Sequence, residues 1–265
     1  MLKRVLVSFD GKCRFKCKHC YTYDLPQTEI ERTVDEIIDN LEDREFDIIY
    51  ISQKNENFFE QDRGVLLCEK LYNRYKRDLF IITRNVLNNV NIARLCKLYN
   101  IMNKENHNLY VGVSICAYDS YTKTETEGIV PTPQERINFL KNLNKLGLKP
   151  ILFLRPVFPD SIIPTQDYLK IIDECQGNIS CVVTAGLMIN HNIAERLEIT
   201  YEELSFGIMG ESEYLKDAIE SEMKMVDVKK KMDLIEKVCK EKKVPLFKHS
   251  LHAVSFLKND SDIII

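Results

Sequence analysis

Three of the nine cysteines lie close together near the start of the 265-residue sequence. Cys13, Cys17 and Cys20 have the spacing CxxxCxxC, whereas the other six cysteines are scattered singly. Thiolates are soft ligands that select iron–sulfur clusters or zinc. At this spacing, three thiolates from one loop can converge on a single iron–sulfur cube and leave one iron open. We therefore expect the chemistry of this protein in this stretch.

Zinc is the alternative metal for the same cysteines. A structural zinc site usually has four closed protein ligands. His19 is adjacent to Cys20 and is too near in the chain to complete the same tetrahedron readily, whereas His249 or His252 could supply a fourth ligand from a distance. Nothing in the spacing requires either histidine. The residues by themselves leave both metals open.

Composition excludes several classes of protein. Lys and Arg number 37 against 40 Asp and Glu, a net charge of −3 that carries no global nucleic-acid signature. No apolar run approaches the roughly 18 residues of a membrane span, and Asp10 interrupts the N-terminal segment before a secretory stretch forms. An odd cysteine count in a chain of this length argues against a disulfide framework. We expect a cytoplasmic protein with reduced thiols and no membrane partner.

The elements that must position the cysteines form a repeating pattern. Strand-like apolar runs alternate with helical periodicity, which predicts βα units around a parallel sheet. Six strands are expected, at residues 4–9, 46–52, 78–84, 109–115, 149–158 and 179–188. Six units are too few for a closed eight-stranded barrel. The predicted fold is α/β, a partial (β/α)6 TIM-type barrel.

The pattern changes after residue 190. We predict a barrel core over residues 1–190 and a helical C-terminal extension over 191–265, with a charged amphipathic helix at 212–242. No Gly- or Ser-rich linker separates the two parts, so the extension is expected to pack on the barrel. Its segment "VPLFKHSLHAVSF" is a candidate to return to the barrel as a short strand and turn. That return would bring His249, Ser250 and His252 towards a substrate.

The cysteine loop follows directly on the first predicted strand, at the carboxyl end where such folds build active sites. In this position "CRFKCKHCY" resembles the cluster motif of the radical S-adenosylmethionine (radical SAM) superfamily. The βα pattern extends the resemblance over residues 1–190. The segments "SQKNENF", "ITR" and "RPVFPD" most resemble the spore photoproduct lyase-like branch, which includes a DNA-repair lyase.

The resemblance implies an enzyme whose [4Fe-4S] cluster is bound by Cys13, Cys17 and Cys20. The open iron would chelate S-adenosylmethionine, and an electron from a flavodoxin- or ferredoxin-type donor would cleave it to a 5′-deoxyadenosyl radical that abstracts hydrogen from a substrate. A lyase, a transferase and an oxidoreductase all remain open. Because a second three-cysteine set is absent from the sequence, nucleic acid, a nucleotide or a small metabolite is favoured over a peptide.

The resemblance also implies cofactor-binding positions on the first two strands. His19 stands where the family usually has an aromatic residue near the adenine. The family's Gly-Gly-Glu-like segment, which binds the amino group of S-adenosylmethionine, is replaced here by "YISQKNENF". Ser52 and Gln53 occupy that strand end, and Glu56 is the nearest acid.

Four further positions lie at the ends of the later strands. The family often has a serine followed two positions later by aspartate near the ribose or sulfonium, and this sequence keeps Ser114 but has Cys116 in place of the acid. Cys116 could donate hydrogen to a substrate radical. Arg84 and Arg155 end otherwise apolar segments, where a guanidinium suits the methionine carboxylate or an anionic substrate.

A group of basic residues surrounds the cysteine loop: Lys3, Arg4, Lys12, Arg14, Lys16 and Lys18. They are consistent with a nucleic-acid or nucleotide substrate, with docking of an acidic electron donor, or with a solvated loop. The alternative function is a non-enzymatic zinc or iron–sulfur module that binds nucleic acid through this loop.

Overall fold

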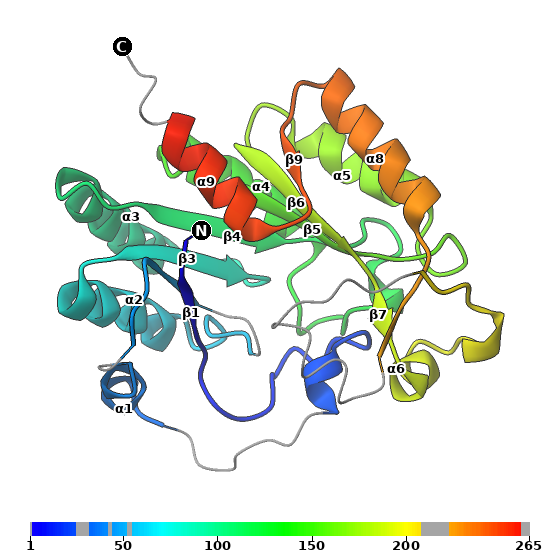
Figure 1. Cartoon of the computed structure of the whole chain (residues 1–265), viewed down its shortest axis with the longest axis horizontal. Coiled ribbons are helices and arrows are strands. Elements are labelled where there is room, and N and C mark those ends of the chain that lie inside the picture. Colours follow the sequence, from blue (N-terminus) through cyan, green and yellow to red (C-terminus); the bar gives the residue numbers. More distant parts are fainter. Residues whose placement is uncertain (1, 25–31, 42–43, 52–54, 208–222, 261–265) are drawn as a thin grey trace.

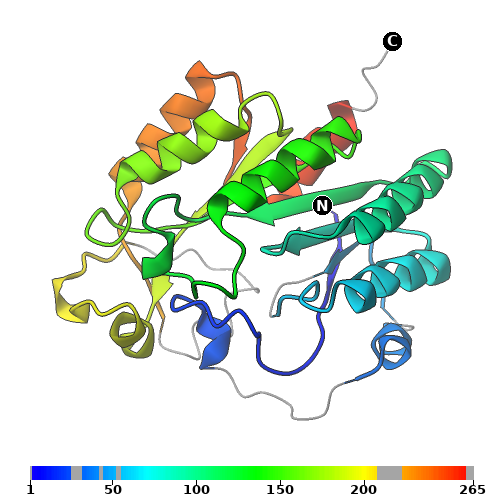
Figure 2. The same ribbon diagram turned by 180° about the vertical axis from the view of Figure 1, so that it is seen from behind.

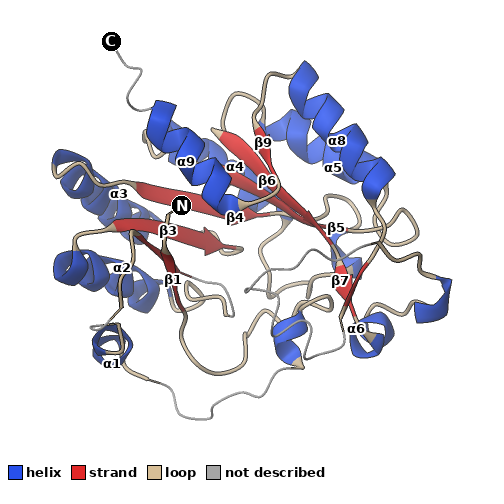
Figure 3. Ribbon diagram, in the orientation of Figure 1, coloured by secondary structure: helices blue, strands red, loops and turns tan. Residues whose placement is uncertain are grey.

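The computed structural model describes residues 2–24, 32–41, 44–51, 55–207 and 223–260. Its centre is a sheet of seven parallel strands in the order β1-β2-β3-β4-β5-β6-β9 (Figures 1 and 3). Consecutive strands lie side by side, so each βα unit returns to the next position in the sheet. The strands are β1 (Arg4–Val7), β2 (Ile48–Ile51), β3 (Asp78–Thr83), β4 (Leu109–Ser114), β5 (Ile151–Val157), β6 (Cys181–Gly186) and β9 (Leu246–Phe247).

Helices cover one face of this sheet (Figures 1 and 2). Threonines begin two of them: the hydroxyls of Thr33 and Thr132 each accept from a backbone N–H three residues on, in capping boxes. No helix in the described ranges is long and apolar enough to cross a membrane. The helices on this face are α1 (Val34–Asp39), α2 (Gln61–Tyr75), α3 (Asn89–Lys104), α4 (Pro133–Lys145), α5 (Thr165–Cys175) and α8 (Lys229–Glu241).

The other face of the sheet carries an aromatic layer and the last helix. Because side chains alternate along a strand, Tyr50, Phe80, Tyr110 and Phe153 all point to this inner face and pack together. Helix α9 (Ser250–Asp260) covers them, on the opposite side of the sheet from the other large helices (Figure 1). The inner face is therefore filled beneath the helix and leaves the carboxyl ends of the strands for a site.

The α/β fold and its partial parallel barrel are confirmed, and all six predicted strands are present. The C-terminal segment does return as a strand: β9 pairs in parallel with β6, where Leu246 lies beside Val182. The extension thus contributes a seventh strand, and its helix α8 packs against α5. The division of the chain at residue 190 stays a prediction.

One predicted element has different bounds. The amphipathic helix expected at 212–242 begins only at Lys229, and residues 208–222 lie outside the described part of the chain. Residues Lys224–Met225 form β8, antiparallel to β7 (Met188–Ile189). The physical reason is that the buried residues Met223 and Val226 are three positions apart, a spacing that also suits one face of a helix, with exposed Lys224 between them.

Candidate functional site

The three cysteines lie in one loop that leaves the carboxyl end of β1. All three thiols are free; Cys17 is buried, and Cys13 and Cys20 are partly exposed. Phe15 anchors the loop, since its ring is 2% exposed and packs with Cys17 and Val130. The Cys20 N–H donates to the Cys17 carbonyl at 3.0 Å and closes a turn around the motif. Local packing therefore fixes the loop at the edge of the sheet.

An arginine from the C-terminal part fastens the same loop. Arg196, the last residue of α6 (His191–Arg196), donates from Nε to the Lys18 carbonyl at 2.9 Å and from Nη2 to the Cys20 carbonyl at 3.0 Å. Its Nη1 also donates to Asp24 at 2.7 Å. The sequence analysis missed Arg196. No local signal could have found it, because its partners lie 172 to 178 residues earlier in the chain.

The donor set fits an iron–sulfur cluster by its chemistry. Three soft thiols in one loop match the ligands such clusters take. Burial raises the pKa of Cys13 and raises that of Cys17 to about 12, so these groups are thiols until a metal displaces their protons. Within the described ranges, no three His, Cys, Asp or Glu side chains are grouped so that they could hold a metal ion. The fit therefore rests on the chemical type of the three donors and on their shared loop at the carboxyl edge, and not on the present arrangement of the three thiols in space.

His19 is buried and neutral between two partners. Its Nδ1 lies 3.2 Å from the Thr124 carbonyl, and its Nε2 lies 3.2 Å from Arg84 Nη2. A carbonyl can only accept and a guanidinium can only donate, which assigns the proton to Nδ1. Burial, with the charge of Arg84, lowers the pKa of His19 to about 3. The ring meets Phe158 edge-on at 5.3 Å. Its role beside an adenine stays a prediction.

Glu56 joins the ends of β2 and β3 beneath the loop. Its Oε1 accepts from the Thr83 hydroxyl at 2.7 Å and from the Phe58 N–H at 3.1 Å, and its Oε2 accepts from the Arg84 N–H at 2.7 Å. Burial raises the pKa of this carboxyl. The Cys13 thiol also lies beside the Glu56 backbone. Ser52 and Gln53, predicted for the same strand end, lie outside the described residues.

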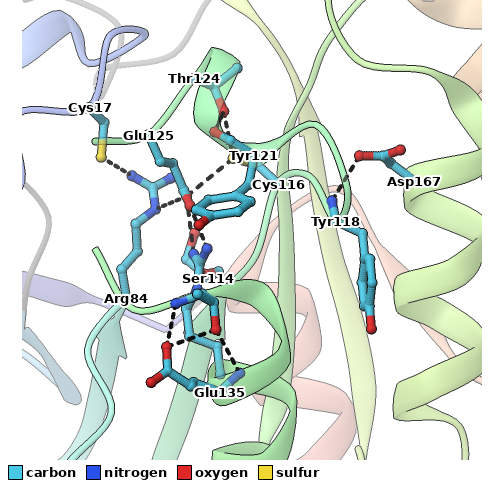
Figure 4. Close-up of polar contacts among 12 residues, drawn as sticks. Cys17, Arg84, Ser114, Cys116, Tyr118, Tyr121, Thr124, Glu125, Glu135 and Asp167 are labelled. Carbon is cyan, nitrogen blue, oxygen red and sulfur yellow. Dashed lines mark hydrogen bonds and ion pairs between the residues drawn. The ribbon is translucent and has the colours of Figure 1, made fainter. Parts of the chain in front are cut away.

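A buried network connects the loop to helix α4 (Figure 4). Arg84 Nη1 donates to Cys17 Sγ at 3.3 Å, and its Nε lies 3.4 Å from Glu125 Oε1 as an ion pair. Arg136 holds both oxygens of Glu125, with Nη1 at 3.0 Å from Oε1 and Nη2 in a shorter bond to Oε2. The side chains of Glu125 and Arg136 have 0% exposure. We call Arg84, Glu125 and Arg136 the buried charge network.

Two members of this network were not predicted from the sequence. Arg136 lies on the apolar stripe of α4 with Leu140 and Leu143, so a charged residue occupies a helix face that is otherwise buried. Since a buried guanidinium needs an acid, this position is a signal that the periodicity contained. Glu125 has no such signal, because it lies in a turn-rich segment between β4 and α4.

Cys116 and Ser114 lie at the end of β4, against this network. Cys116 is fully buried, and its thiol donates to Glu125 Oε1 at 3.4 Å. Burial raises the pKa of Cys116, which keeps the group a thiol. The Ser114 carbonyl accepts from Arg136 Nη1 at 2.7 Å. A hydrogen-donor role for Cys116 stays a prediction.

Arg155 lies on β5, on the same inner face as Phe153, and its guanidinium covers that ring at 4.4 Å. The pairing of β5 with β6 shifts between Leu154 and Val157, where Pro156 has no N–H to donate. Burial, with the nearby charges of Arg84 and Arg4, lowers the pKa of Arg155 to about 10. No carboxylate among the described residues pairs with it. Arg155 is a cation that faces the barrel interior without an acidic partner from the described chain.

The remaining candidates lie at the start of α9. The rings of His249 and His252 contact each other edge-on at 5.4 Å and are exposed. Ser250 is buried, and its hydroxyl accepts from Arg4 Nη1 at 3.5 Å. The structure thus brings Cys17, His19, Arg84 and Cys116 together. Glu56 joins this group because its carboxylate accepts from the Arg84 backbone N–H. It does not join the two histidines to the cysteines.

Comparisons with known proteins address the fold. No family model and no curated relative matches the sequence. Among solved structures, SuiB of Streptococcus suis bound to S-adenosylmethionine has 15% identity and a TM-score of 0.58, over 93% of this chain and 49% of SuiB. A spore photoproduct lyase with bound S-adenosylmethionine and dinucleoside spore photoproduct has 12% identity and a TM-score of 0.57, over 89% of this chain and 72% of the lyase.

A third similar structure is anSMEcpe with bound S-adenosylmethionine, at 13% identity and a TM-score of 0.52, over 92% of this chain and 64% of anSMEcpe. The chain spans about half the length of SuiB. At identities this low, the matches show that the backbones follow a similar course and say nothing about the chemistry of this chain. At the level of fold they confirm the resemblance that the cysteine motif predicted. The chain has the partial-barrel fold of the radical SAM enzymes.

Proposed function

We propose that this chain is a radical SAM enzyme that binds a [4Fe-4S] cluster through Cys13, Cys17 and Cys20. The observation that carries the proposal is a CxxxCxxC loop at the carboxyl edge of a parallel partial barrel, with a guanidinium 3.3 Å from the sulfur of Cys17. When bound, the cluster and S-adenosylmethionine supply an electron and a 5′-deoxyadenosyl radical that abstracts hydrogen from the substrate.

Residues at the strand ends would hold the cofactor. An ionised carboxylate offers about four acceptor positions, and Glu56 uses three of them on Thr83, Phe58 and Arg84. One acceptor position is left for an amino group such as that of S-adenosylmethionine. Arg155 has no acid of its own among the described residues, which supports a contact with the methionine carboxylate.

The same edge supplies a wall for the adenosyl group. Ser114 ends β4, in the position that the family resemblance assigns to the ribose or sulfonium side. The ring of His19 is 8% exposed and packs edge-on against the fully buried ring of Phe158, which supports an aromatic contact between His19 and an adenine. Apolar side chains around the loop, such as Phe15, limit the entry of water. A reactive radical requires this exclusion of water to avoid side reactions.

Charge supports the choice of substrate and of electron donor. The guanidiniums of Arg84 and Arg155 lie near each other at the strand ends, which favours a substrate with an anionic group: a nucleotide, a nucleic acid or a small metabolite. The similar solved structures do not distinguish between these substrates and a peptide, since one holds a dinucleoside photoproduct and SuiB has also been captured with the precursor peptide SuiA.

Exposed Lys12 and Lys16 on the loop support docking of an acidic flavodoxin- or ferredoxin-type donor. All nine cysteines are free, which suits a reducing cytoplasm.

Anaerobic reconstitution tests this function. With iron, sulfide, S-adenosylmethionine and dithionite, the wild-type chain should gain a brown chromophore and release 5′-deoxyadenosine. The Cys17→Ser variant should lose both. Cys96→Ser is the matched control, because Cys96 is a partly exposed thiol on α3, outside the site. Stoichiometric zinc binding without reductant-dependent 5′-deoxyadenosine would instead support the zinc module that binds nucleic acid.

A further inference from the structure

The charges of the buried charge network do not balance. Arg84 and Arg136 are both guanidiniums, which stay protonated in proteins, and Glu125 is the one carboxylate between them. His19 also contacts Arg84: its Nε2 accepts from the guanidinium while its Nδ1 donates to the Thr124 carbonyl, so the ring is neutral. The side-chain exposures are 19% for Arg84 and 0% for the other two. The three side chains of the network therefore carry one positive charge in excess, at its partly exposed end on Arg84; the next carboxylate, Glu56, bonds the Arg84 backbone N–H and not its guanidinium.

A buried charge without a counter-charge is costly, so the excess points to an anion nearby. The next contact of Arg84 is Cys17 Sγ, 3.3 Å from Nη1 (Figure 4). A cysteine that ligates a metal is a deprotonated thiolate. The negative charge that completes the network would therefore come from the ligated form of Cys17.

We propose that Arg84, held in place by Glu125 and Arg136, is a positioning residue that donates a hydrogen bond to the cluster ligand Cys17 and raises the reduction potential of the cluster. This inference rests on the proposed function. Hydrogen bonds to the sulfurs, net charge and burial are the protein's means of setting an iron–sulfur potential. Reduction adds a negative charge to the cluster, and a fixed cation beside one of its sulfurs stabilises that charge.

Two changes that each remove one charge from this network should act in opposite directions. Arg84→Gln removes the cation, so the cluster should become harder to reduce. Glu125→Gln removes the anion that offsets Arg84, so the cluster should become easier to reduce. A purely structural network would loosen the loop in both variants and could not give opposite signs.

The experiment is a redox titration of the full chain, purified and reconstituted anaerobically and followed by the cluster's absorbance and its electron paramagnetic resonance signal. At a fixed potential, the reduced-to-oxidised ratio should fall at least tenfold in Arg84→Gln, which is about 59 mV for a one-electron couple. It should rise in Glu125→Gln and change less in Arg84→Lys, which keeps the charge. Cluster loading is measured separately by iron and sulfide content.

Two arginines serve as matched controls. Arg94→Gln removes a cation that pairs with Glu69 on the outer helices, and should change neither loading nor potential. Arg196→Gln releases the Lys18 and Cys20 carbonyls without touching a sulfur, so loading should fall while the potential of the loaded fraction stays at the wild-type value.

The outcomes separate the two proposals. A wild-type chain that binds no cluster contradicts the proposed function. A wild-type chain with a cluster, and an Arg84→Gln variant at the same potential, contradicts this inference alone. If Arg84→Gln retains no cluster, Glu125→Gln decides: a raised potential supports the inference, whereas an unchanged or lowered potential, or loss of that cluster too, overturns it.

Discussion

The Glu125→Ala substitution tests the energetics of the site without any cofactor. Glu125 is fully buried, accepts two hydrogen bonds from the Arg136 guanidinium and forms an ion pair with Arg84. Removing one partner from a buried ion pair costs about 3–5 kcal/mol, because the other charge stays buried and uncompensated. For a chain of this size, that loss lowers Tm by roughly 6–20 °C.

The assay is urea and thermal unfolding of the apo protein, followed by circular dichroism. Glu69→Ala is the matched control, since Glu69 also makes two hydrogen bonds to one arginine, Arg94, at 3.0 and 2.6 Å, but both side chains are about 30% exposed. This exposed pair should contribute no more than about 1 kcal/mol. An equal loss of stability in the two variants would refute the reasoning, because Glu125 is fully buried and also pairs with Arg84, whereas the Glu69 pair is partly exposed.

The same pair predicts a pH dependence. Burial by itself would raise the pKa of Glu125, but the charges of Arg136 and Arg84 outweigh it and hold the pKa below its ordinary value of 4.5. A carboxyl with a lowered folded pKa stabilises the protein above its unfolded pKa, and this contribution disappears as the pH falls through the folded pKa. The gap in unfolding free energy between wild type and Glu125→Ala should therefore be constant above about pH 5.5 and shrink below pH 4.5. A gap that widens in acid contradicts the assignment of charges.

Three further predictions concern the loop, the barrel and the partner. Arg196→Gln should expose the cysteine loop, which limited proteolysis and hydrogen exchange would detect as faster cleavage and faster exchange at Lys18 and Cys20; unchanged protection would mean that α6 does not fasten the loop. Gly112→Ala should destabilise the chain by about 1–3 kcal/mol, because a Cβ there would lie 2.5 Å from the ring of Phe153; denaturant unfolding that matches the wild type would argue against a tightly packed inner face. Charge reversal at Lys12 and Lys16 to Glu should slow reduction by flavodoxin at low salt, with the difference lost at high salt; an equal rate at all salt concentrations would exclude this face as the docking site.

The sequence predicted the strands well because their apolar runs are short and bounded by polar segments. Each expected strand from "RVLVSF" to "ISCVVTAGLM" contains an observed one. Strand β9 was anticipated only as a possible return of "VPLFKHSLHAVSF", since two residues carry little periodicity. Strand β8 was missed for the same reason, hidden at the start of a charged stretch that resembles a helix.

The site was predictable only where its residues are neighbours in the chain or lie at strand ends. The spacing of Cys13, Cys17 and Cys20 is local, Arg84 is the last residue of a predicted strand, and Cys116 directly follows another. Glu125 and Arg196 were not found, because their importance comes from long-range pairing that no local pattern encodes. Arg136 stood on an apolar helix face, where the cost of a buried charge could have marked it.

The production of 5′-deoxyadenosine under anaerobic conditions tests the central claim most directly. The reconstituted wild-type chain is mixed with S-adenosylmethionine, with and without dithionite, and the products are separated by chromatography. We predict reductant-dependent 5′-deoxyadenosine from the wild type and none from a variant with Ala at Cys13, Cys17 and Cys20. Equal 5′-deoxyadenosine from both proteins, or none from a wild-type chain loaded with iron and sulfide, would contradict the account.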